Sequence, residues 1–324
     1  MLRRNDGAVV VMKFLAGSLF VVLISFSQAA SAHLKWFAVD DHRTNLSDYY
    51  SAYHNELIIG GLLLCLMIGL AVWIDKNLTF KIEPPPASKK YIIRAFSILV
   101  GLSLLYASYN QSILAAHYLV STQALVLLQY AQAIVALMLI FNLFTRSAAG
   151  VLIAIYVILA SQVGLLEVLD YVNFMGIAAY LILSNSKDEH QQAFAIPALR
   201  VITGATLVIL AFSEKLLNPD IGLRFLAMND WNFMQAIGIT AYTNELFLLS
   251  AGLVELLIGV IFMLGLLTRI NTLVLLAFMI TSNVTFMLQN LNAEAITEIA
   301  GHAPILAIGL IFLMSGPGQK WKIT

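Results

Sequence analysis

The chain has 324 residues, of which 60% are hydrophobic and 11% are charged. A mean hydropathy of +0.87 excludes an ordinary soluble globular domain. Acidic and basic residues balance at 18 each, so no basic excess indicates a nucleic-acid partner. The single cysteine excludes an internal disulfide and dithiol redox chemistry. The composition therefore predicts an all-α polytopic membrane protein in contact with membrane lipids.

Residues 1–32 have the pattern of a secretory signal peptide. Basic residues at the start are followed by the apolar run 14–26, and Ala30-Ser31-Ala32 fits the small-x-small cleavage rule. Cleavage there makes His33 the first residue of the mature chain, on the outer side of the membrane. An uncleaved signal anchor is the alternative interpretation.

Apolar stretches of membrane-spanning length recur along the rest of the chain and predict about nine transmembrane helices. With His33 outside, eleven Lys and Arg residues fall on the inner side and four on the outer side. This bias predicts a multi-pass protein whose mature N-terminus lies on the outer side of the membrane and whose C-terminus lies in the cytoplasm. The predicted spans are 56–74, 91–108, 124–144, 148–168, 171–184, 196–213, 245–267, 270–289 and 299–315.

The last eight predicted helices divide into two related halves. Residues 132–146 align without a gap against residues 255–269, and both segments end in Thr-Arg. An even number of spans in each half predicts two parallel four-helix repeats after one N-terminal helix. The predicted units are a signal peptide (1–32), an outer segment (33–55), the first transmembrane helix with a Pro-rich loop (56–90), the first repeat (91–184), a cytoplasmic linker (185–194) and the second repeat (195–324).

The two halves differ at aligned positions, where neutral residues of the first half correspond to ionisable residues of the second. This difference predicts a scaffold copy and a working copy. The first half has Ser108, Tyr109, Gln132 and Ile177, and the second has Glu214, Lys215, Glu255 and His302.

Glu255 is predicted to lie deep inside the membrane, where an acidic side chain costs about 2.5–3.5 kcal/mol. It is either a structural hydrogen-bonding group or a group that exchanges protons or binds substrate. Arg200 falls at a cytoplasmic helix end, where it either reaches lipid phosphate or serves the site. Glu214 and Lys215 form either a solvated helix-end ion pair or part of the site.

The outer loop 218–240 carries Trp231 and Phe233 among polar residues. Such aromatics either anchor the loop at the headgroup level or form a lid over a pocket on the lipid side.

The second half resembles the DoxX family of bacterial membrane proteins. The resemblance rests on an arginine that opens a helix, on Ser213-Glu214-Lys215, on a Glu-containing helix that ends in Thr-Arg, and on Gly301-His302-Ala303-Pro304. It covers about residues 195–315. It implies a four-helix membrane unit and, as in some members of the family, a role in a quinone-linked oxidoreductase.

Three hypotheses follow. In the first, the protein is an oxidoreductase subunit with a partner subunit. Glu255, His302, Glu214, Lys215 and Arg200 then serve quinone chemistry, and Trp231 and Phe233 contact the cofactor. In the second, the repeat interface holds a small polar or cationic solute for transport. In the third, copper binds at the mature N-terminus, with the candidate ligands His33, His42, His54 and Asp40.

Overall fold

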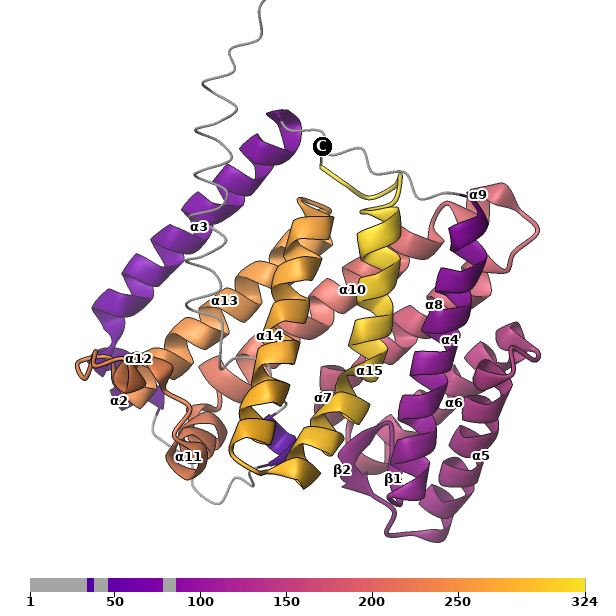
Figure 1. Ribbon diagram of the computed structural model, residues 1–324, viewed down its shortest axis with the longest axis horizontal. Coiled ribbons are helices and arrows are strands. Elements are labelled where there is room, and N and C mark those ends of the chain that lie inside the picture. Colours follow the sequence, from indigo (N-terminus) through magenta and orange to yellow (C-terminus); the bar gives the residue numbers. More distant parts are fainter. Residues whose placement is uncertain (1–33, 38–45, 78–85, 324) are drawn as a thin grey trace, which may run out of the picture.

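The computed structural model describes residues 34–37, 46–77 and 86–323 (Figure 1). The elements are η1 (Leu34–Trp36), α2 (Leu46–Ala52), α3 (His54–Asn77), α4 (Pro86–Tyr109), β1 (Ser112–Ile113), β2 (Ala115–Leu119), α5 (Gln123–Ile140), α6 (Thr145–Val163), α7 (Leu165–Val168), η2 (Leu169–Tyr171), α8 (Asn173–Ser184), α9 (Glu189–Gln192), α10 (Ala195–Leu210), the π-helical turn η3 (Ala211–Leu216), α11 (Pro219–Asn229), α12 (Phe233–Ala236), α13 (Asn244–Leu264), α14 (Thr268–Leu288) and α15 (Asn292–Ser315). The predicted all-α fold is confirmed, with a short antiparallel hairpin of β1 and β2 added between α4 and α5.

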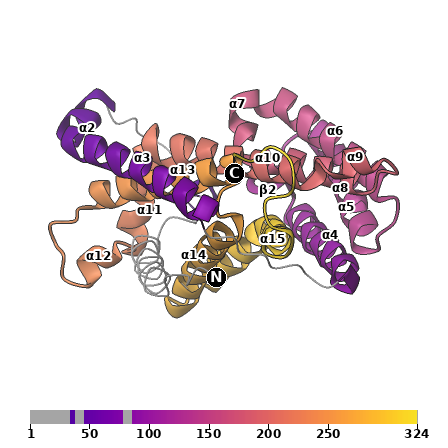
Figure 2. The same ribbon diagram turned by 90° about the horizontal axis from the view of Figure 1, so that it is seen from above.

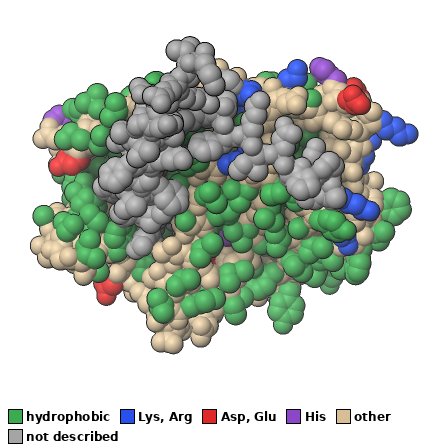
Figure 3. All heavy atoms as spheres, turned by 45° about the horizontal axis from the view of Figure 1, so that its top comes forward, with side chains coloured by type: hydrophobic (Ala, Val, Ile, Leu, Met, Phe, Trp, Pro, Cys, Tyr) green, Lys and Arg blue, Asp and Glu red, His purple; other side chains and the backbone are tan. Residues whose placement is uncertain are grey.

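Eight helices in the described ranges are long and apolar enough to cross a membrane. A ninth span results if the bent pair of α7–η2 and α8 is counted as one crossing, so the predicted polytopic architecture holds. Apolar side chains cover broad areas of the surface, as Figure 3 shows for one face. They include Ile58, Leu62 and Leu66 on α3, which are exposed and suited to contact with lipid.

The two predicted halves pack in matching ways. In the first half α4 packs on α5 and α6 on α8, and in the second α10 packs on α13 and α14 on α15. The halves also exchange contacts, because α4 lies against α15 and α10 lies against α8 (Figures 1 and 2). A duplicated unit related by a twofold axis would give this pattern, although the duplication itself stays a prediction.

Helix α6 ends earlier than the predicted span 148–168. It stops at Gly164, whose φ of 104° is open to glycine but strained for other residues. The chain then forms α7 and η2, and α8 begins at an angle of 60° to them. This break carries Asp170 out of a continuous span and into the interior of the bundle.

Helices α10 and α13 approach each other closely at two glycines. A Cβ atom built on Gly204 would lie 2.5 Å from the carbonyl oxygen of Gly259, and one on Gly259 would lie 2.7 Å from that of Gly204. Small residues of this kind let helix backbones touch in membranes, where close packing rather than hydrophobic burial holds helices together. The contact fixes the distance between α13, which carries Glu255, and α10, which continues into η3 with Glu214 and Lys215.

We expect Gly204→Ala to destabilise the fold by about 1–3 kcal/mol, because the added methyl group meets backbone atoms that cannot move aside. Thermal unfolding in detergent micelles measures this loss. Gly150→Ala is the matched control, since a Cβ on Gly150 of α6 meets no atom within 4 Å. Equal melting temperatures for the two variants would contradict the proposed backbone contact.

Candidate functional site

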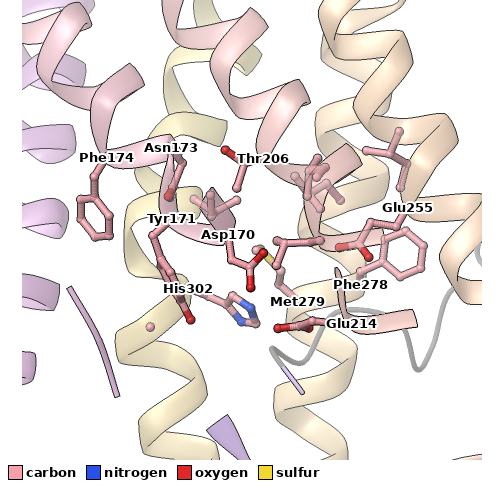
Figure 4. A pocket seen from close by; sticks show the side chains of 16 residues that line it. Asp170, Tyr171, Asn173, Phe174, Thr206, Glu214, Glu255, Phe278, Met279 and His302 are labelled. Atoms are coloured by element: carbon pink, nitrogen blue, oxygen red, sulfur yellow. The ribbon is translucent and has the colours of Figure 1, made fainter. Parts of the chain in front are cut away.

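A cavity lies between the two halves of the bundle, and Figure 4 shows the side chains around it. It offers about 50 Å³ to the centres of water-sized molecules, which is room for on the order of four waters. Its polar lining comes from six elements, and apolar side chains of α10, α13 and α14 form much of the remaining wall. The polar and titratable residues that line it are Asp170, Tyr171, Asn173, Thr206, Glu214, Glu255 and His302.

Glu255 pairs with Lys215 inside the bundle. Lys215 Nζ donates to Glu255 Oε2 at 2.8 Å, and the exposed side-chain fractions are 3% for the lysine and 12% for the glutamate. A buried ion pair of this kind compensates two charges that would each be costly alone. Lys215 is therefore paired with Glu255 in the protein interior. Glu214 and Lys215 are both buried, so they do not form the solvated helix-end pair that the sequence also allowed.

The π-helical turn η3 explains why Lys215, and not Glu214, faces Glu255. In the first half, Ser108 at the end of the regular helix α4 contacts the matching Gln132. Arg94 to Ser108 and Arg200 to Glu214 have the same separation in sequence, which predicts Glu214 at this place. Because a π-helical turn contains an extra residue, it moves Lys215 into that position and also keeps Glu214 buried.

Gln132 in the first half has a structural role. Its side-chain nitrogen donates to Leu104 O, Ser108 Oγ and Ser112 O, and its oxygen accepts from Leu114 N. These bonds satisfy the amide within the protein and fasten the hairpin to α4 and α5. The contrast with the charged Lys215–Glu255 pair agrees with the predicted division into a scaffold copy and a working copy.

The N-terminal segment Leu34–Phe37 covers two of the cavity carboxylates. Leu34 N donates to Glu214 Oε2 at 3.1 Å, and Lys35 Nζ lies 2.5 Å from Asp170 Oδ2. Asp170, which belongs to the first half, also accepts from Ser213 Oγ at 2.7 Å, so its charge is met by a group of the second half and by Lys35 of the segment. The segment therefore joins the two halves at the cavity.

The aromatic residues of the outer loop support this segment and lie apart from the cavity. Trp231 is buried, with its ring centroid 4.5 Å from that of Phe286, and Phe37 packs 5.0 Å from the same ring. Phe233 packs against Phe247. Neither Trp231 nor Phe233 is among the residues that line the cavity, so the structure gives no support to their predicted contact with a cofactor.

Arg200 lies away from the other predicted site residues. Its guanidinium is fully buried and donates to the carbonyls of Phe262, Met263, Pro317 and Trp321. It thus binds the end of α13 and the C-terminal tail, where a cation is favoured by the unpaired carbonyls of a helix terminus. The geometry shows a structural role in place of both predicted ones.

The predicted metal ligands are not brought together. His33, Asp40 and His42 lie outside the described residues. His54 begins α3 and is exposed. Among the residues that the structure describes, no group of three or more His, Cys, Asp or Glu side chains forms a metal-binding cluster.

Two residues at the site were missed in the sequence. Asp170 falls between the predicted spans 148–168 and 171–184. The only sequence signal of the break that buries it is Gly164 followed by the acids Glu167 and Asp170. No sequence pattern marks Lys35, because its partner Asp170 is 135 positions away in the chain.

The fold and the apolar surface define a multi-pass α-helical membrane protein. Residues 195–288 match the family model DoxX, which confirms the predicted resemblance over most of the second half. The matched range contains Glu214, Lys215 and Glu255, whereas Asp170 and His302 lie outside it. No curated protein and no solved structure matches the chain.

We expect Lys35→Ala to loosen the segment, because the buried carboxylate of Asp170 loses its ammonium partner. The free energy of unfolding should fall by about 1.5–3 kcal/mol, the range for hydrogen bonds to charged groups. Hydrogen exchange should also show faster exchange of the Leu34 amide. Lys35→Arg, which keeps the charge, is the control, and unchanged exchange in Lys35→Ala would refute the contact.

The stabilisation by Lys35 should persist until strongly alkaline pH. Burial alone lowers the pKa of Lys35, but the charge and hydrogen bond of Asp170, with the charges of Glu214 and Glu167, raise it above its ordinary value of 10.5. The pKa of Lys35 is higher in the folded than in the unfolded protein. The stabilisation by Lys35 is therefore complete at pH values below the unfolded-state pKa, and it is lost as the pH rises through the folded-state pKa. The difference in melting temperature between wild type and Lys35→Ala measures this. A difference that shrinks already below about pH 9, well under the ordinary lysine value, would contradict it.

Proposed function

We propose that the protein is a subunit of a membrane oxidoreductase and that its cavity binds the head group of a quinone. The observation that carries this proposal is that Glu255 of α13 and His302 of α15 line one cavity whose walls are otherwise largely apolar. An apolar pocket with a few convergent polar groups is the usual form of a small-molecule site. Because quinone reduction takes up protons together with electrons, an acid and an imidazole beside the ring suit this chemistry.

The residues of the chain can be given separate tasks in such a site. Glu255 and His302 hold and exchange protons, while Lys215 compensates the charge of Glu255 at 2.8 Å. Leu210, Ile258 and Phe278 would lie against the ring and exclude water. A bound quinone supplies the electron-accepting carbonyls, and the electrons come from a partner subunit in this proposal.

The size of the cavity sets a condition on this proposal. A cavity of about 50 Å³ is well below the roughly 150 Å³ that admits a benzene ring, so it is too small for a quinone ring as it stands. The Leu34–Phe37 segment is not among the residues that line the cavity, but it contacts two of the cavity carboxylates through Leu34 N and Lys35 Nζ. In the proposed cycle the segment moves off Asp170 and Glu214 when the ring enters.

A second candidate function is the binding or transport of a small cationic solute. The observation that favours it is that Asp170, Glu214 and Glu255 gather from both halves, and that two of them are met by the protein's own ammonium groups, Asp170 by Lys35 and Glu255 by Lys215. A solute ammonium can replace such a group without a change in net charge. Uptake into proteoliposomes that is lost in Glu255→Gln would favour transport over quinone chemistry.

Copper binding at a mature N-terminal His33 also stays a proposal. Its test is the metal content of the purified protein, compared with that of a variant carrying an extra alanine before His33. Equal copper in the two would exclude a chelate that needs the terminal amine.

We expect Glu255→Gln to lower quinone-dependent turnover at least about 100-fold, the lower end of what a general acid–base group contributes. The glutamine keeps the shape and can still accept from Lys215, but it leaves the buried ammonium group without its counter-charge, so the melting temperature is measured alongside turnover. Glu245→Gln, in the first turn of the same helix, is the matched control. Turnover that is equal in wild type and Glu255→Gln would rule out the proposed role of this carboxylate.

A further inference from the structure

Glu298 is a buried carboxylate of α15 that lies one helical turn before His302. Its side chain is 0% exposed, and Ser282 of α14 donates a hydrogen bond to Oε1. The other oxygen, Oε2, has no hydrogen-bond partner among the described residues. A carboxylate in such surroundings is costly unless a proton or a cation accompanies it. The question is therefore which group supplies that proton or cation.

His302 is the titratable group next to Glu298. Its Nδ1 lies 3.6 Å from Glu298 Oε1, which is within ion-pair distance but longer than a hydrogen bond. Catalytic hydrogen bonds are often long before a ligand binds and shorten in the complex. The ring itself lines the cavity (Figure 4). With Nδ1 towards Glu298, Nε2 is the ring nitrogen directed away from that carboxylate.

The other charged groups at the cavity have partners elsewhere. Asp170 is paired with Lys35 and accepts from Ser213, and Glu255 is paired with Lys215. Glu214 accepts from the backbone of Leu34. Glu298 lies within ion-pair distance of His302 and has an oxygen without a hydrogen-bond partner among the described residues, so it can compensate a positive charge on the ring.

The first half has neutral residues at the matching places. Asn173 has the same offset from Ile177 as Glu298 has from His302. The carboxylate and the imidazole therefore occur together in the second half and are both replaced in the first. This joint change is expected if the two side chains act as a unit.

We propose that Glu298 is a positioning residue for His302. It accepts the Nδ1 proton in a hydrogen bond and compensates the charge when the ring carries two protons, which leaves Nε2 to exchange a proton with a ligand in the cavity. The identity of that ligand rests on the proposed quinone function. The effect of Glu298 on the imidazole does not, because it belongs to the protein alone.

The first test measures quinone-dependent turnover of the full chain in detergent or proteoliposomes. Glu298→Gln keeps the shape of the side chain and should lower turnover about 100-fold, as loss of an effective acid–base group does. The double variant Glu298→Gln/His302→Gln should be as slow as His302→Gln alone, because residues that act through one another are not additive. Glu294→Gln, one turn earlier on α15, is the matched control and should keep wild-type turnover. Additive losses in the double variant would overturn the proposal.

The second test does not depend on turnover. Protein labelled with [15N]histidine should show His302 protonated at Nδ1, with His302→Gln identifying the signal. Glu298→Gln should move that proton towards Nε2, and Ser282→Ala should do so to a smaller extent because it only loosens Glu298. An unchanged His302 signal in Glu298→Gln would overturn the inference. If wild type shows no turnover with any quinone but its His302 signal responds to Glu298, the quinone proposal fails and this inference stands.

Discussion

The structure depends on keeping charges compensated where water is scarce. Glu214, Glu255 and Asp170 are buried or nearly so in a bundle of apolar helices, and an uncompensated ion there is too costly to keep. Glu214 is met by the backbone amide of Leu34 and Asp170 by Lys35, both from the N-terminal segment, and Glu255 is met by Lys215 of η3. The fold brings these donors together, and the cavity is the space that their arrangement leaves.

This compensation ties together parts of the chain that are far apart in sequence. Lys35 precedes the first transmembrane helix, Asp170 belongs to the first half, and Ser213 belongs to the second, yet all three meet at one carboxylate. The site is therefore assembled by three segments and not by the DoxX-like region of residues 195–288 alone. A fragment limited to that region would lack Asp170, Lys35 and His302.

Periodicity and hydropathy were sufficient to predict the helical class, most of the spans, and that Glu255 and His302 lie in the same part of the bundle. These features depend on local composition and on the cost of a polar side chain in lipid. The position of Asp170 was not predictable in this way, because it depends on the turn at Gly164. The direction in which the Lys215 side chain points depends on one extra residue in a π-helical turn. The structural role of Arg200 depends on backbone carbonyls at the end of another helix. Such long-range contacts leave no periodic signal in the sequence.

The contact between Gly204 and Gly259 restricts how the bundle can move. Two helices whose backbones touch cannot slide or separate without losing the packing that joins them. Relative movement of α10 and α13 is therefore restricted at this contact. Glu255 of α13 consequently keeps a constant height relative to Lys215, which follows α10 in η3, so sliding of the two helices does not break the ion pair.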